Sequence, residues 1–147
     1  MTDGSAGWPQ LRDAILVAAF EGWNDAGDAA TDAVEHLELL WGARPLTELE
    51  PDEYYDFQVN RPTVSLVDGV SRRVAWPTTR CRSADQQAQS FDLVLVRGIE
   101  PNMRWRAFCE ELLDVVRRRS TCGLSSALAH CCRTRRTPGH SGDRHVV

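Results

Sequence analysis

The chain has 147 residues, of which 42% are hydrophobic and 26% charged, which is typical of one globular domain rather than a disordered chain. No apolar run approaches the length of a membrane span, and residues 1–12 lack a signal-peptide core, so we expect a cytoplasmic protein without membrane contact. The net charge of −4 conceals an abrupt change in charge along the chain. Residues 1–116 carry 10 arginines and 20 acidic residues, whereas residues 117–147 carry seven arginines and one acidic residue. This shift predicts an α/β domain at 1–118 and a disordered Arg/Cys/His-rich tail at 119–147.

A strand, a loop and a helix are predicted in succession near the N-terminus. Residues 14–20 form a continuous apolar run, as in strands covered on both faces. Residues 26–41 place apolar side chains at spacings of three and four, which is typical of a helix with one buried face. Asn24 or Asp25 suits the N-cap of this helix. This order is the first half of a βαβ unit and predicts an α/β fold.

The rest of the domain is expected to add a hairpin, a second covered strand and a second helix. Asp68 and Gly69 between two alternating runs predict a β-hairpin. The polar residues 77–90 are expected to form a surface loop, and residues 91–96 a buried strand. A loop then leads to the second helix, with Asn102 as its N-cap and Trp105 on its buried face.

Four blocks of sequence carry a family resemblance: residues 20–30, 55–62, 76–79 and 95–105. Together they resemble the PAC2 family, the bacterial relatives of the second proteasome assembly chaperone, and the actinobacterial branch in particular. The resemblance implies an α/β/α sandwich with a mostly parallel central sheet, phosphorylase-like in outline, and it implies self-association. Members of the family are longer, so the resemblance also implies that this chain holds only the N-terminal part of the domain and that its sandwich is incomplete.

The tail departs from the family pattern after about Arg119. Reading residues 128–139 in another frame, with GC-rich codons, gives Gly-Ala-Leu-Leu-Pro-Asp-Thr-Pro-His-Thr-Arg-Pro, which resembles the motif expected at this place in the family. We therefore expect the tail to be an out-of-frame translation of a longer gene.

Two loops are candidate ligand sites, because each follows a strand and opens a helix: residues 21–25 and 98–102. The acidic side chains in both loops oppose phosphate binding, and capping alone would also explain Asn102. Trp23 and Trp76 lie in loop or strand-end positions and are candidate interface anchors. The candidate ligand-binding residues are Glu21, Asn24, Arg97, Glu100, Asn102 and Arg104.

No catalytic set is recognisable in the sequence. It has no dinucleotide or P-loop glycine pattern, no nucleophile elbow and no paired nucleophile and base. No cofactor or metal is predicted, because the tail residues Cys122, His130, Cys131, Cys132 and His140 lack the spacing of a zinc site. The arginine-rich tail has no interleaved aromatic residues, so no nucleic-acid partner is expected.

We therefore expect a non-enzymatic protein that acts through protein–protein contacts, like an assembly chaperone. The resemblance implies 20S proteasome subunits and further copies of the chain as partners. Two alternatives stay open. One is an enzyme of ligase or phosphorylase-like type that binds a nucleotide or small molecule at loops 21–25 and 98–102, although the chain has no lysine to hold phosphates. The other is a non-functional truncated product.

Overall fold

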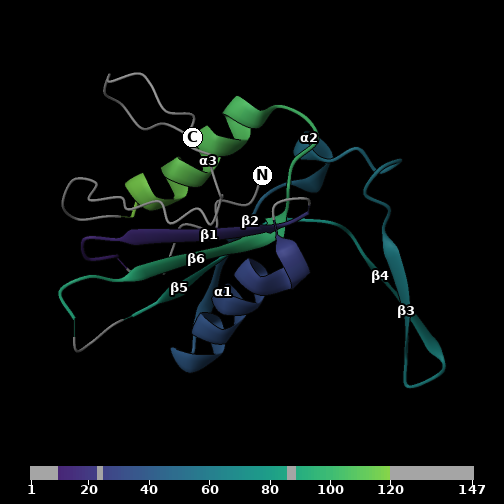
Figure 1. The fold of residues 1–147 in the computed structure, drawn as a ribbon, viewed down its shortest axis with the longest axis horizontal. Coiled ribbons are helices and arrows are strands. Elements are labelled where there is room, and N and C mark those ends of the chain that lie inside the picture. Colours follow the sequence, from purple (N-terminus) through teal and green to yellow (C-terminus); the bar gives the residue numbers. More distant parts are fainter. Residues whose placement is uncertain (1–9, 23–24, 86–88, 120–147) are drawn as a thin grey trace.

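A four-stranded mixed sheet forms the centre of the protein in the computed structural model, which describes residues 10–22, 25–85 and 89–119 (Figure 1). The strand order is β1-β6-β5-β2. The strands of this sheet are β1 (Ile15–Glu21), β2 (Arg44–Glu48), β5 (Arg80–Ala84) and β6 (Leu93–Ile99). The α/β class predicted from the sequence is confirmed.

The prediction of a mostly parallel sheet is wrong. Only β1 and β6 run parallel, whereas β6 with β5 and β5 with β2 are antiparallel. The cause is β5, which arises from the segment expected to be a surface loop. The chain returns from β5 to β6 through a short connection, and parallel neighbours would need a crossover of about a dozen residues or more.

Helices cover both faces of this sheet (Figure 1). On one face lies α1 (Ala29–Leu40), preceded by the short 3-10 helix η1 (Ala26–Asp28). On the other lie α2 (Pro51–Tyr54) and α3 (Trp105–Arg117). The core under α3 is the larger and contains buried side chains from β1, β5 and β6. No helix among the described residues is long and apolar enough to cross a membrane.

The N-terminus of α1 is capped by Asp25, as the sequence predicts, although η1 intervenes. The Asp25 carboxylate accepts the backbone N–H of Ala30 at 2.7 Å and of Thr31 at 3.3 Å, and the Thr31 hydroxyl at 2.5 Å. These hydrogen bonds, that of the hydroxyl first, hold the pKa of Asp25 below its ordinary value. The other predicted cap, Asn24, lies outside the described residues.

The start of α3 differs from the prediction. Asn102 does not cap the helix, because its amide oxygen instead accepts the backbone N–H of Asp56 at 3.2 Å and the side chain of Asn60 at 2.8 Å. Trp105 is exposed rather than buried. The buried stripe begins one turn later and consists of Phe108, Leu112 and Val116.

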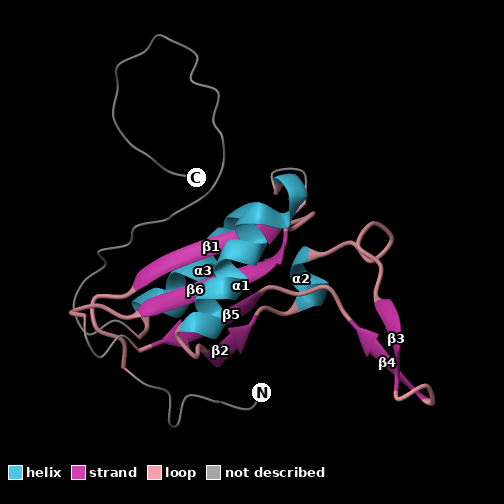
Figure 2. Cartoon of the chain, turned by 60° about the horizontal axis from the view of Figure 1, so that its bottom comes forward, coloured by secondary structure: helices cyan, strands magenta, loops and turns pink. Residues whose placement is uncertain are grey.

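The predicted hairpin is confirmed and consists of β3 (Thr63–Val67) and β4 (Ser71–Ala75). Between the paired residues Val67 and Ser71, Asp68 and Gly69 both have positive φ, as the central residues of a type I′ turn do. The two strands project away from the central sheet (Figures 1 and 2), and every residue in them is exposed.

Candidate functional site

Three arginines lie on the sheet face that α1 covers. Arg80 and Arg82 alternate with the buried Cys81 and Ser83 along β5. Arg97 of β6 is the direct register partner of Arg80. Like charges opposite each other across two strands repel, so this end of the sheet requires carboxylates nearby.

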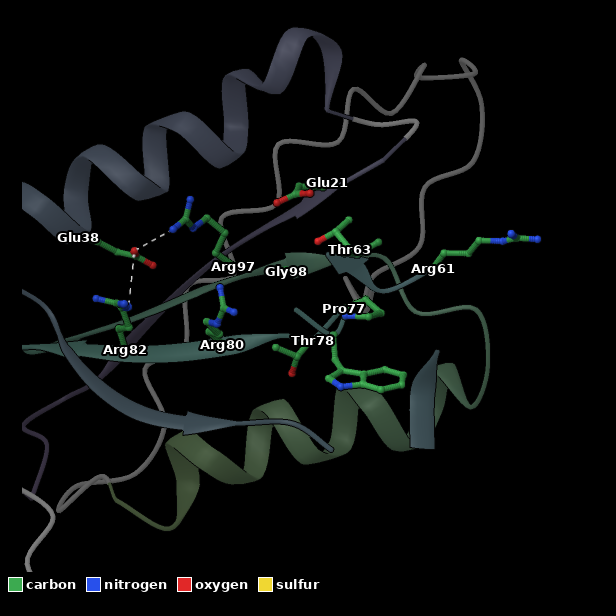
Figure 3. Close-up of a pocket in the computed structure, with 12 residues that line it drawn as sticks. Glu21, Glu38, Arg61, Thr63, Pro77, Thr78, Arg80, Arg82, Arg97 and Gly98 are labelled. Atoms are coloured by element: carbon green, nitrogen blue, oxygen red, sulfur yellow. Dashed lines mark hydrogen bonds and ion pairs between the residues drawn. The ribbon is translucent and has the colours of Figure 1, made fainter. Parts of the chain in front are cut away.

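Glu38 of α1 supplies the central carboxylate and is only 6% exposed. Its Oε2 lies 3.4 Å from Nη2 of Arg97 and 3.7 Å from Nε of Arg82 (Figure 3). Glu35, on the same helix, pairs with Nη1 of Arg97 at 2.9 Å. One buried carboxylate therefore serves two guanidinium groups.

Arg80 and Arg82 keep unused donors. The ion pair between Glu48 of β2 and Arg80 is made at Nε, at 3.3 Å, and that between Glu38 and Arg82 is also made at Nε, at 3.7 Å. The terminal amino groups of both arginines donate no hydrogen bond to any residue that the structure describes. Those groups are the donors that a bound anion would use.

A cleft of about 290 Å³ opens beside the arginines, between the sheet and the base of the hairpin. Figure 3 shows Arg80 directed towards Arg97 and Gly98, whereas the Arg61 side chain extends outward. The residues that line the cleft are Glu21, Glu38, Arg61, Thr63, Trp76, Pro77, Thr78, Arg80, Arg82, Arg97, Gly98 and Ile99.

The base of the cleft is held rigidly by a close approach of the chain to Gly98. A Cβ at this position would lie 2.5 Å from Oγ1 and 2.7 Å from Cα of Thr79. The Tyr55 hydroxyl donates to the carbonyl oxygen of Ile99 at 2.9 Å and accepts from the Thr79 hydroxyl at 2.6 Å. Burial of this network raises the pKa of Tyr55.

The structure places the two predicted loops side by side, at the ends of neighbouring parallel strands. Glu21 and Ile99 are register partners in the parallel β1–β6 pair, and the backbone N–H of Glu100 donates to the carbonyl oxygen of Glu21 at 3.2 Å. Glu21 and Arg97 line the cleft, whereas Glu100 packs against Gly22 at its edge. Whether these residues bind a ligand stays a prediction.

The other predicted ligand residues lie elsewhere. Arg104 forms an ion pair with Glu53 of α2 and lies 6.0 Å from the centre of the Tyr54 ring. Asn102 fixes the loop that follows α2. Asn24, and the interface candidate Trp23, lie outside the described residues. Of the predicted ligand residues that the structure describes, Glu21 and Arg97 line the cleft, whereas Asn102 and Arg104 do not.

Sequence reasoning missed four charged residues of the cleft: Arg61, Arg80, Arg82 and Glu38. The signal for two of them was present, because arginine alternates with small or apolar residues over residues 80–84, as in a half-buried strand. The glutamine-rich stretch that follows hid this short strand. Trp76 lines the cleft as well, is 53% exposed, and packs edge-on against Phe57 with ring centres 5.0 Å apart.

The described residues that line the cleft include charged and polar groups that can bind a ligand. No group of three His, Cys, Asp or Glu residues that could hold a metal occurs among them. Burial raises the pKa of Cys81 to about 12, so its thiol stays protonated at neutral pH and is a poor nucleophile. The cysteines and histidines of the tail that were weighed as metal ligands lie outside the described residues.

The hairpin presents a second candidate surface. Val64 and Val74 are register partners, and Leu66 follows Val64 on the same side of β3, so the three side chains share one face. They are 63%, 49% and 64% exposed. We call Val64, Leu66 and Val74 the hairpin face. The opposite face carries Thr63, Ser65, Val67, Ser71, Arg73 and Ala75, and Arg72 is the register partner of Leu66 on the hairpin face.

An α/β domain with an exposed apolar arm and an arginine-lined cleft has the features of a binding protein. The PAC2 family profile matches residues 19–141, and the chain belongs to the PAC2 family. This confirms the resemblance recognised in the sequence.

Several solved structures are similar to this chain. A proteasome-assembly chaperone homologue of Mycobacterium tuberculosis is 54% identical, with a TM-score of 0.65, over 71% of this chain and 44% of that one. A PAC2 family protein from Streptomyces avermitilis is 56% identical, with a TM-score of 0.65, over 72% of this chain and 45% of that one. A protein of unknown function from Corynebacterium glutamicum, 22% identical with a TM-score of 0.64 over 86% of this chain and 44% of that one, shows the fold alone. This chain thus spans less than half the length of each relative. No protein of curated function matches it.

Proposed function

We propose that the protein acts through protein–protein contacts, as an assembly-chaperone-like member of its family that docks partners on the hairpin face. The observation that supports this is the exposure of three large apolar side chains on an arm that projects from the sheet. Full burial of a Val or Leu side chain contributes about 1.5–3 kcal/mol. A partner that covers this face therefore gains several kcal/mol before the costs of association.

The 20S proteasome is the partner we propose to test first, because a relative at 54% identity is described as a proteasome-assembly chaperone homologue. Self-association, a cytoplasmic location and an actinobacterial source belong to the same proposal. So does a phosphorylase-like outline for the complete fold, of which the described residues are one part.

Capture of purified 20S core particle by the immobilised chain tests this function. The test variant is Leu66→Ser with Val74→Thr, and the matched control is Val70→Ser, which removes an apolar residue that is 85% exposed but lies at the hairpin turn. We expect capture by the wild type and the control, and at least about a tenfold loss in the test variant, equivalent to 1.4 kcal/mol. The thermal unfolding of all three should agree, because exposed residues contribute little to stability. Equal capture by both variants, or none by the wild type, would contradict the proposal.

The arginine-lined cleft supports a second candidate function, an enzyme that binds a nucleotide or small anion at loops 21–25 and 98–102. A thermal-shift screen with ATP, AMP and inorganic phosphate tests it, and an increase in melting temperature with a nucleotide is the result that supports it. The third candidate is a non-functional truncated product with an out-of-frame tail. Sequencing the gene tests that candidate, and an intact tail without an alternative family-like frame would refute it.

A further inference from the structure

We propose that the arginine-lined cleft binds the carboxylate of an acidic peptide segment in a partner protein. The inference rests on the proposed function, since it names the chemistry of the partner that the hairpin face docks. The inference goes further than the proposed function because it assigns a second contact to the partner, made by the arginines of the cleft, next to the apolar contact on the hairpin face.

The donors for this carboxylate are the terminal amino groups of Arg80 and Arg82. Each guanidinium has five N–H donors in a planar fork that matches the two oxygens of a carboxylate. In both residues the ion pair is made at Nε, and the terminal amino groups donate no hydrogen bond to a described residue, so these groups can donate to a carboxylate. Arg97 is different, because Glu35 and Glu38 already contact its two terminal amino groups. It acts as the positive wall of the cleft rather than as the clamp.

The charge of the lining favours a single negative charge. Four arginines and two glutamates are among the described residues that line the cleft, a net charge of +2 within a chain whose net charge is −4, while Glu35 and Glu48 contact Arg97 and Arg80 from outside the lining. An acidic segment is therefore repelled by most of the protein and attracted here. Bringing one carboxylate against Arg80 also offsets its repulsion with Arg97 across the strand pair.

A phosphate group fits this lining less well than a carboxylate. Glu21 would repel a dianion. The hydroxyl of Thr78, which would otherwise donate to a phosphate oxygen, instead donates to the carbonyl oxygen of Leu49 at 2.9 Å. Among the described residues no helix N-terminus contributes to the lining, so this part of the cleft lacks the backbone donors of an ordinary phosphate site.

The position of the cleft indicates a peptide rather than a free small acid. Thr63 is the first residue of β3 and Trp76 follows the last residue of β4, and both line the cleft. The base of the hairpin is thus part of the cleft wall. A segment in which apolar and acidic residues alternate could place its apolar side chains on Trp76 and on the hairpin face while its carboxylate reaches Arg80 and Arg82.

Fluorescence anisotropy with a labelled hexapeptide tests this inference in the full chain. The probe is Glu-Leu repeated three times, and the neutral control peptide is Gln-Leu repeated three times. We expect at least about tenfold tighter binding of the glutamate peptide, weakened by salt. Arg80→Gln with Arg82→Gln should abolish the difference, whereas Arg106→Gln, an exposed arginine outside the cleft lining, should retain it. If the double variant does not fold, Arg80→Gln alone should reduce the difference, because this exposed pair contributes little to stability.

Equal binding of the two peptides, or an unchanged preference in the folded arginine variant, would overturn the inference. So would displacement of the peptide by equal concentrations of inorganic phosphate or glutarate, which would show a site for small anions instead. These outcomes are separate from those for the proposed function. If the hairpin variant loses 20S capture while the peptides bind equally, the docking function stands and the carboxylate site does not.

Discussion

Replacement of Gly98 by alanine tests how the base of the cleft is built. Gly98 does not have a positive φ, so its backbone conformation suits any residue. On backbone grounds alone, Gly98→Ala should stabilise the protein by about 0.4–1 kcal/mol, because alanine restricts the unfolded chain. The contacts of the added Cβ predict the opposite sign.

The cost follows from how little the surroundings can move. The Cβ would lie 2.7 Å from Cα of Thr79 and 2.8 Å from the carbonyl oxygen of Thr78, and both are backbone atoms. Relief requires the chain before β5 to move away from β6, which disturbs the hydrogen bond between Tyr55 and Thr79 and the one from the Leu49 N–H to the Thr79 carbonyl oxygen. Overpacking costs about 1–3 kcal/mol and each weakened hydrogen bond about 1 kcal/mol. We therefore expect Gly98→Ala to lower the free energy of unfolding by about 2–4 kcal/mol.

Urea unfolding followed by far-UV circular dichroism measures this change, and Gly42→Ala is the matched control. Gly42 has a φ of +57° and nothing within 4 Å of its added Cβ, so its replacement carries only backbone strain of about 1 kcal/mol. Gly98→Ala should be the more destabilising of the two. A Gly98→Ala variant as stable as the wild type, or more so, would refute the close-approach argument.

Three further predictions concern the charges and the edge of the sheet. Glu38→Gln should lower the free energy of unfolding in urea by about 2 kcal/mol, because it leaves two partly exposed guanidinium groups without their shared carboxylate. The control, Glu35→Gln, removes an exposed ion pair and should cost less than about 1 kcal/mol. Equal costs for the two variants would contradict this. The pKa of Asp25 in the folded protein lies below its ordinary value. Its contribution to the free energy of unfolding is therefore present above the ordinary pKa and is lost as the pH falls through the lower, folded-state pKa. Melting temperatures below pH 4 should therefore converge for the wild type and Asp25→Asn, and a constant difference would count against the cap. Finally, β1 is an edge strand of the described sheet with an uncharged, apolar centre, so the chain should self-associate in sedimentation velocity, and a monodisperse monomer that melts cooperatively would oppose this.

The elements predicted well from the sequence were those with a long or strongly marked pattern. The apolar run of β1, the helical stripe of α1 and the Asp68–Gly69 turn each specify a local structure without reference to the rest of the chain. The Asp25 cap belongs to the same group, since its partners lie five and six residues away.

The failures concern contacts between segments distant in sequence. Asn102 carries the local signal of a helix cap, but the loop after α2 competes for the same amide oxygen and takes it. Trp105 fits the helical stripe by spacing, yet α3 passes over the sheet only from Phe108 onward, so the tryptophan stays in solvent. The helical period alone does not predict at which residue the contact between a helix and the sheet begins.

The arginine face depends most on long-range pairing. Residues 80–84 alternate as in a half-buried strand, but the segment is short and the polar residues after it hide the pattern, and only the pairing of β5 with β6 brings Arg80 opposite Arg97. Once paired, the two positive charges constrain their neighbours, because carboxylates must then come from the elements beside this end of the sheet, such as Glu48 of β2. Glu38 meets that requirement from α1, where its burial would otherwise be unfavourable.

The order of the chain also joins the two proposed surfaces. Residues 61–82 run from Arg61 through both strands of the hairpin to Trp76 and then to Arg80 and Arg82, so the hairpin is inserted between two parts of the cleft lining. A partner that bends or shifts the hairpin must therefore move Thr63 and Trp76 relative to the arginines of β5. Docking on the hairpin face and capture of a carboxylate are thus expected to affect each other's affinity, and by linkage the effect must be equal in both directions. Because the proposed partner supplies both the apolar surface and the carboxylate, a free acidic peptide bound in the cleft should compete with the partner and lower its capture, whereas the neutral peptide should not.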